Sequence, residues 1–144
     1  MIKIKTWIKQ NNHFIEYHDY KGRVNVSCAY IEGALELKIH DIDVINKDMW
    51  DYIDQLWSYI TVGIITLADN KKFETYFPDQ PVKLTFTPVM DNVLIRVVGC
   101  CDIKVIVNRD EFIYAMAKEA IDFFDFLGIK VDGYQQLITI ATRK

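Results

Sequence analysis

The spacing of apolar residues along the chain switches between a period of two and a period near 3.6. Alternation of apolar and polar residues is typical of half-buried strands, and turn signals such as Asn11–Asn12 and Gly99 separate the alternating runs. The pattern predicts these strands: Ile2–Ile8, His13–Tyr20, Arg23–Ile31, Ala34–Ile39, Phe73–Phe77, Val82–Thr87, Asn92–Val98 and Asp102–Asn108. Gly33 is expected to end the third of them.

The longest run with helical spacing lies within Asn46–Asn70, and we expect one helix there with Asn46 as its N-cap. Its predicted buried stripe comprises Met49, Trp50, Ile53, Leu56, Trp57, Ile60, Ile64 and Leu67. In the last two turns Val62 and Ile65 replace the polar face, which indicates that something covers the end of this helix. The cover is either the C-terminal segment of the chain or a partner surface.

A second helix is expected over Arg109–Leu127, because Asn108 and Glu111 have the spacing of a capping box and Gly128 suits the residue after a helix end. The tail after Ile129 is ambiguous. A short helix from Gly133 and a strand over Leu137–Thr142 both fit its pattern, and we favour the helix because it would cover Val62 and Ile65.

These elements predict a single α+β domain over residues 1–144: a twisted antiparallel sheet of about seven or eight strands, with two main helices packed on one face. Residues 44–52 resemble residues 106–114 at the junction of a strand with a helix. An internal duplication explains this match, and shared capping chemistry explains it at least as well.

Composition limits the expected partner class and cellular compartment. The chain is 51% hydrophobic, enough for a core without disulfide staples, and its net charge of −3 argues against nucleic acid and suits a basic partner. Three cysteines, Cys28, Cys100 and Cys101, are an odd number and indicate a reducing compartment. The first ten residues lack the apolar core of a signal peptide, and Asn46–Asn70 is too polar at its start to span a bilayer. We therefore expect a cytoplasmic protein with no membrane partner.

The sequence contains none of the common phosphate-binding, metalloprotease or nucleophile motifs, so we expect no enzyme activity, no cofactor and no metal. The best acid–base or metal cluster is His40-Asp41-Ile42-Asp43, for which a solvated loop is the alternative. Cys100 and Cys101 are expected to be structural cysteines at a hairpin, because the flanking residues supply no positive charge to activate a thiol.

One surface is a candidate for binding a protein. Tyrosines at the edge of the predicted first helix, with carboxylates nearby, would form an aromatic and acidic face that steers a basic partner. The residues of this predicted face are Asp41, Asp48, Asp51, Tyr52, Asp54 and Tyr59. The alternative is an ordinary solvated helix face.

Several strings of the chain resemble an uncharacterised family of bacterial domains, over about the last two thirds of its length. The strings are Leu56-Trp57-Ser58-Tyr59, Glu111-Phe112, Phe123-Phe124 and, most specifically, Tyr76-Phe77-Pro78-Asp79-Gln80-Pro81, which continues to Phe86. Such small acidic α+β proteins are similar in style to immunity proteins of polymorphic toxin systems. The resemblance implies a protein partner and supplies no catalytic residues.

Three functional hypotheses follow. The first is a non-enzymatic protein-binding domain, specifically an immunity protein that neutralises a bacterial toxin domain by direct binding. The second is a small-molecule-binding protein or enzyme with its site near His40, Asp41 and Asp43. The third is a homodimer whose contact uses Val62 and Ile65.

Overall fold

The structure, a computed structural model, describes residues 1–20 and 30–142 and has an α+β architecture with two antiparallel sheets and three α-helices. Sheet A has the strand order β2-β1-β3-β4, and the short β5 pairs with β3. Sheet B is a meander in the order β6-β7-β8-β9. The strands of sheet A are β1 (Ile2–Gln10), β2 (His13–Glu16), β3 (Glu32–Ile39), β4 (Ile42–Ile45) and β5 (Asp51–Tyr52). Those of sheet B are β6 (Phe73–Tyr76), β7 (Lys83–Val89), β8 (Asn92–Val98) and β9 (Asp102–Asn108).

The prediction of one continuous sheet is therefore wrong. Among the described strands, no backbone ladder joins the two sheets, although β4 lies against β8 and β9. The ladder between β3 and β4 is short and shifts register between Leu37 and Lys38, so sheet A ends at β4. The chain then passes through a 3-10 turn and the short β5, which pairs with β3, before it enters the helix layer. Within the described residues, contacts other than backbone ladders hold the two sheets together.

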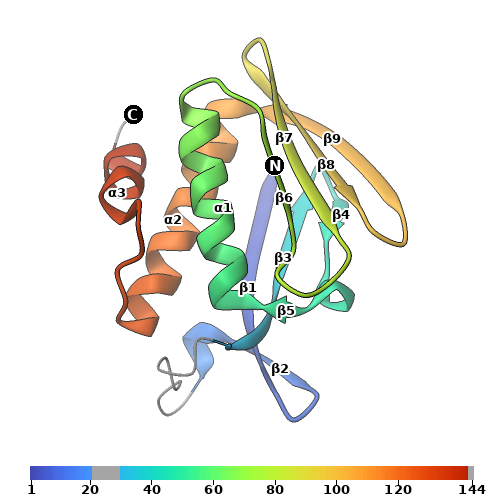
Figure 1. Ribbon diagram of the computed structural model, residues 1–144, viewed down its shortest axis with the longest axis vertical. Helices are drawn as coiled ribbons and strands as arrows, with labels where there is room; N and C mark the ends of the chain where they lie inside the picture. The colour runs from blue at the N-terminus through green and yellow to red at the C-terminus, as the bar shows by residue number, and fades with distance from the viewer. Residues whose placement is uncertain (21–29, 143–144) are drawn as a thin grey trace.

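The helices are α1 (Ile53–Ala68), α2 (Arg109–Leu127) and α3 (Tyr134–Thr142), and all three lie on one side of the strands (Figure 1). Helix α1 packs on β3, β6 and β7, while α2 packs on β1, β8 and β9. Each of these helices therefore touches both sheets, and one core serves the whole fold. Its largest fully buried side chains include Trp57, Phe86, Phe112, Phe123 and Phe124.

The first helix begins at Ile53, six residues later than an N-cap at Asn46 predicts. Asn46 is a cap, but its side chain accepts from the backbone N–H of Asp48 (2.9 Å) at the start of a 3-10 helix, η3 (Lys47–Met49). The chain then extends into β5, where Asp51 and Tyr52 pair with β3. This ladder keeps residues 50–52 extended, so Met49 and Trp50 do not belong to the buried stripe of α1.

The second helix and the three strands before it are largely as predicted. Helix α2 has the expected bounds, Asn108 accepts from the N–H of Glu111 (2.9 Å), and Gly128 ends the helix with φ of 73°. Strand β2 is shorter than predicted because a 3-10 helix, η1 (Tyr17–Asp19), follows it. Most of the predicted strand Arg23–Ile31 lies outside the described residues.

Gly33 lies inside β3 and does not end a strand. A Cβ there would come within 2.2 Å of the Trp7 carbonyl oxygen and 2.7 Å of Ile53 Cγ2. The glycine therefore permits β1, β3 and the start of α1 to approach closely. The glycine at this position is therefore explained by close packing and not by a turn.

The C-terminal tail forms a helix, as favoured above, and α3 packs on α2 and α1. Gly133, with φ of 92°, lies directly against Ile65. Val62 stays 55% exposed, so the expectation that the tail covers both residues holds for Ile65 and is wrong for Val62. No helix in the described parts of the chain combines the length and apolarity needed to cross a membrane.

A buried carboxylate joins the two sheets near the start of α1. The Asp51 side chain is 3% exposed, and its two oxygens accept from the backbone N–H groups of Tyr52 (2.7 Å), Asp79 (3.0 Å) and Gln80 (2.8 Å). The Gln80 side chain donates in turn to the carbonyl of Trp50 (2.9 Å). Asp51 therefore fixes the proline-bounded turn between β6 and β7 to the strand that precedes α1.

Replacing Asp51 with Asn tests this junction. The amide –NH2 cannot accept, so at least one backbone N–H loses its partner in a buried site, and we expect the free energy of unfolding to fall by about 2 kcal/mol. Urea unfolding of Asp51→Asn beside Asp48→Asn, an exposed carboxylate in the preceding turn, measures the difference. Equal stability of the two variants would contradict the assigned role.

Candidate functional site

The predicted aromatic and acidic face does not form as expected. Asp51 and Asp54 are both buried, and Asp54 accepts from the N–H of Ile31 (3.1 Å). Both carboxylates accept backbone N–H groups near the junction of β5 with α1 and do not form an exposed acidic face. The reason is the late start of α1, because a helix from Asn46 would have turned both residues to solvent.

The other members of that predicted face are dispersed. Asp48 is exposed in η3, Tyr52 is half-buried on β5, and Tyr59 is 39% exposed on α1. Asp41 lies in the β3–β4 turn, where it and His40 both have positive φ.

The His40-Asp41-Ile42-Asp43 cluster is exposed, with His40 and Asp41 in the β3–β4 turn and Ile42 and Asp43 at the start of β4. His40 Nδ1 lies 3.4 Å from the N-terminal amino group, and Asp43 forms an ion pair with Lys38 (3.5 Å). Within the described residues, no group of three or more His, Cys, Asp or Glu side chains is placed to hold a metal ion. Cys100 and Cys101 are free thiols exposed at the β8–β9 hairpin, and Cys28 lies outside the described residues.

The structure brings together a different set of aromatic residues, on the face of sheet A opposite the helices. Side chains alternate across a strand, and Thr6 and Ile8 of β1 face the core, so Lys5, Trp7 and Lys9 face the other way. Strand register then places a row of side chains across that face: Phe14, Lys9, Glu32 and Tyr52. We call this surface the aromatic face; its aromatic members are Trp7, Phe14, Tyr30, Trp50 and Tyr52.

Lysines stack on these rings. Lys47 Nζ lies 3.8 Å from the centre of the Trp7 ring and 5.9 Å from that of Phe14. Lys9 Nζ lies 4.4 Å from the centre of the Trp50 ring and pairs with Glu32 (3.6 Å). In such contacts the ammonium group lies over the face of the ring, and each contact contributes about 0.5–1 kcal/mol of stabilisation where it is exposed.

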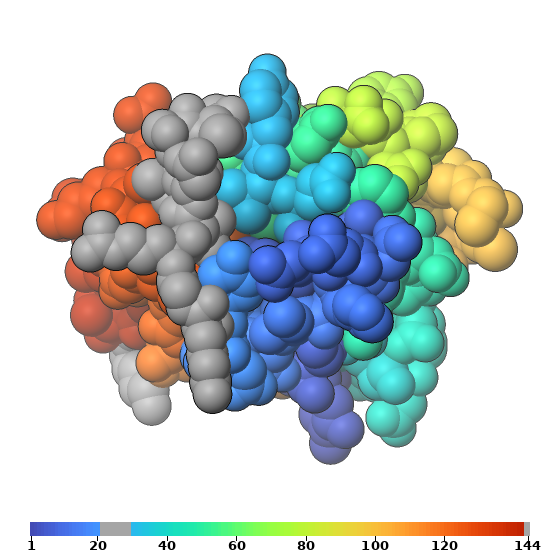
Figure 2. All heavy atoms as spheres, turned by 90° about the horizontal axis from the view of Figure 1, so that it is seen from below, coloured from blue at the N-terminus to red at the C-terminus, as the bar shows by residue number. Residues whose placement is uncertain are grey.

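The edge of the aromatic face continues to the junction made by Asp51. Tyr30 packs edge-on against Tyr52 with ring centres 5.1 Å apart, and Tyr30 is 64% exposed. Figure 2 shows this end of the molecule, where the β1–β2 hairpin (blue), the segment with η3 and β5 (green-blue) and the 77–82 turn (yellow-green) share one surface. The junction therefore places the aromatic face beside a fixed turn.

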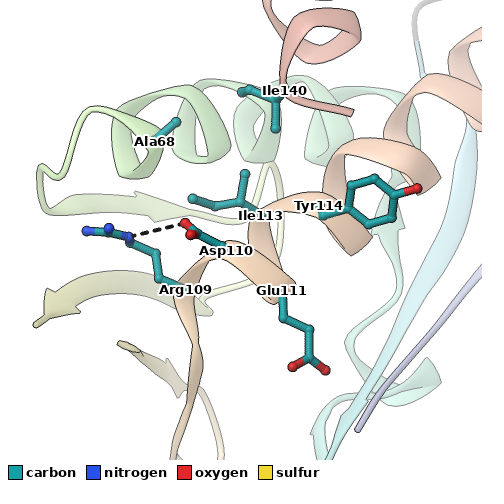
Figure 3. A pocket seen from close by; sticks show the side chains of 7 residues that line it. All are labelled: Ala68, Arg109, Asp110, Glu111, Ile113, Tyr114 and Ile140. Atoms are coloured by element: carbon teal, nitrogen blue, oxygen red, sulfur yellow. Dashed lines mark ion pairs between the residues drawn. The ribbon is translucent and has the colours of Figure 1, made fainter. Parts of the chain in front are cut away.

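A groove lies elsewhere, between the C-terminal end of α1, the start of α2, and α3 (Figure 3). Its volume is about 710 Å³, within the range of small-molecule sites. The apolar lining is Ala68, Ile113, Tyr114 and Ile140, and the polar lining is Arg109, Asp110 and Glu111. The Arg109 guanidinium donates a hydrogen bond to the side-chain oxygen of Asn70. It also lies 3.8 Å from the Asp110 carboxylate, which partly compensates its charge.

A buried polar chain links three elements inside the core. The indole N–H of Trp57 donates to the Thr6 hydroxyl (3.1 Å), which donates to the Glu119 carboxylate (2.7 Å). Burial raises the pKa of Glu119, nearby Asp122 and Glu16 raise it further, and the Thr6 bond and His18 oppose the shift.

Tyr17 lies next to this chain. Burial raises the pKa of its phenol above the usual range, and Glu119 adds to the shift. Its hydroxyl is buried and finds no hydrogen-bond partner among the described residues. These groups are packed around rings such as Phe123 and Phe126, and they form part of the core.

Comparison of the chain with protein-family models, with curated proteins and with solved structures gives no match.

Sequence reasoning missed Trp7, Phe14 and Trp50 as a surface. Helical spacing predicts Trp50 in the core stripe of a helix that does not include it. Alternation along β1 does put Trp7 on the same side as Lys3, Lys5 and Lys9, so that signal was present in the sequence. The pairing of β1 with β2, which adds Phe14, was not.

The Glu119 carboxylate gives a pH-dependent prediction. Because its pKa is raised in the folded protein, the folded state binds this proton more tightly, and stability falls as the pH rises from about 4.3 through the folded-state pKa. Glu119→Gln removes the charge and keeps an acceptor for Thr6.

We expect Glu119→Gln to be more stable than the parent at neutral pH and no more stable below pH ~4. Thermal unfolding across this pH range measures the difference, with Asp41→Asn at an exposed turn as the control. A variant that is less stable than the parent at neutral pH would show that burial does not dominate at this site.

Proposed function

We propose that the chain is a non-enzymatic protein-binding domain that uses the aromatic face of sheet A. The observation that carries the proposal is the gathering of five aromatic side chains, interleaved with lysines and glutamates, on a sheet face turned away from the helices. Tyr and Trp are enriched in the energetic centres of protein interfaces.

The half-buried state of these rings also supports the proposal that the aromatic face binds a protein. Trp7, Phe14, Trp50 and Tyr52 are intermediate in exposure, and lysine stems and ion pairs hold them in place. Rings that are ordered before binding lose little conformational entropy in a complex. A rigid sheet surface of this kind suits a partner with a matching apolar patch.

The specific form of the proposal is an immunity protein that neutralises a bacterial toxin domain by direct binding. Its support is the style of this small acidic α+β chain and the Tyr76–Pro81 string, whose turn Asp51 fixes beside the aromatic face. The partner would be the product of a neighbouring gene.

The experiment is co-expression with the product of the adjacent gene, scored by growth and by complex formation. Tyr30→Ala and Phe14→Ala should each weaken the complex about tenfold, because each removes a ring worth more than 1 kcal/mol at an interface centre. The matched control is Tyr114→Ala, a tyrosine 36% exposed on α2 and outside the aromatic face. Wild-type affinity in both face variants, or no complex with the adjacent product, would count against the proposal.

A second candidate function is small-molecule binding, and the volume of the groove between α1, α2 and α3 favours it. This groove is not lined by His40, Asp41 or Asp43, so the location expected from the sequence receives no support from it.

Filling the groove tests the second function. Ala68 is exposed and lines it, so Ala68→Trp should occupy the space with little cost to the core. If small molecules bind there, those that raise the melting temperature of the parent in a metabolite screen should fail to do so for the variant. Ligands that stabilise both proteins equally would exclude the groove as their site.

A further inference from the structure

One end of the aromatic face is a basic pocket that the proposed function does not yet explain. Lys3, Lys5 and Lys38 surround Glu36 there, in a hollow of about 160 Å³. This volume is below the range of small-molecule sites and matches a single side chain.

Strand pairing forces the lysines together. Lys3 of β1 lies directly opposite Lys38 of β3 in the antiparallel ladder. Like charges in this position repel and destabilise the sheet. Lys38 is partly compensated by Asp43 (3.5 Å) and Lys5 by Glu16 (3.8 Å), both in exposed pairs that open at little cost. Within the described chain, no ion pair within 4.0 Å is formed by Lys3.

Among the described residues that line the pocket, the one carboxylate is already engaged. Glu36 accepts from the indole N–H of Trp7 (3.3 Å), which also links the pocket to the rings. Lys5 Nζ lies 5.8 Å from the centre of the same Trp7 ring. Basic pocket and aromatic face are therefore continuous, with Trp7 at their boundary.

We infer that the partner inserts an acidic loop here: a carboxylate enters between Lys3, Lys5 and Lys38, and an adjacent apolar side chain packs on Trp7. The inference rests on the proposed function and specifies the chemistry of the partner. It reverses the expectation from net charge, because the chain is acidic overall while three of the four residues that line this pocket are lysines. A nucleic acid backbone is the competing source of negative charge, which the net charge of −3 disfavours.

The test uses defined probes: a fluorescent peptide of glutamates and leucines, the same peptide with lysine for each glutamate, and a single-stranded oligonucleotide. The acidic peptide should bind saturably and more weakly at high salt, and its complex should shift the NMR signals of Lys3, Lys5 and Lys38. Equal binding of the lysine peptide, preference for the oligonucleotide, or no binding of the acidic peptide overturns the inference.

Charge reversal supplies the variants. Lys3→Glu should weaken acidic-peptide binding about tenfold while raising the melting temperature, since it replaces the repulsive cross-strand pair with Lys38 by an attractive one. Lys38→Glu should weaken binding to a similar extent without the gain in stability, because it also turns the Lys38–Asp43 ion pair into a repulsive contact. Gain in stability with loss of binding cannot come from misfolding. Lys118→Glu, on the exposed side of α2, is the matched control and should change neither binding nor the pocket signals.

The adjacent-gene partner separates the two proposals. A complex that weakens with Tyr30→Ala but not with Lys3→Glu keeps the protein-binding function and refutes the acidic loop. Binding of the acidic peptide at the pocket without any adjacent-gene complex supports the surface chemistry and refutes the assigned partner. Self-association in sedimentation experiments that disappears with Lys3→Glu would identify a second copy as the occupant and overturn the inference.

Discussion

The carboxylate of Asp51 is the contact on which the arrangement of this fold depends most. It belongs to a two-residue strand, and it binds backbone N–H groups of a turn 28 and 29 residues further along the chain. Sheet A, sheet B and the start of α1 meet at this one side chain. A charge so deeply buried is tolerated only where hydrogen bonds replace its water, and the three N–H groups supply them.

This junction has a consequence for function. The backbone ladder between β5 and β3 lies at this junction, keeps Asp51 and Tyr52 extended, and turns Tyr52 toward the side of sheet A away from the helices. A helix through the same residues would have put Trp50 in the core and Asp51 and Asp54 in solvent. One local competition between a strand ladder and a helix therefore decides whether the exposed surface is acidic or aromatic and basic.

The two faces of sheet A have different roles: the inner face packs in the core and the outer face is the candidate binding surface. The inner face carries Thr6, whose hydroxyl connects Trp57 of α1 with Glu119 of α2, and the helices pack there. The outer face carries rings, lysines and glutamates in partly exposed pairs, which contribute little to stability. Residues that are costly or neutral for folding are the ones expected at a binding surface, and the opposed Lys3 and Lys38 fit that expectation.

The sequence by itself determined the α+β class, the last three strands of sheet B, and helix α2 with its Asn108 cap and Gly128 end, because each of these depends on residues close together in the chain. It could not determine the division into two sheets or the late start of α1. Both are decided by pairings between distant segments, such as Asp51 with Gly33 and with the 77–82 turn. The candidate surface follows the same rule: alternation in β1 aligned Trp7 with the lysines, while only the tertiary structure brought Phe14, Lys38 and Tyr52 beside them. Hydrogen-bonded register between strands is a long-range choice, and it sets which side chains share a face.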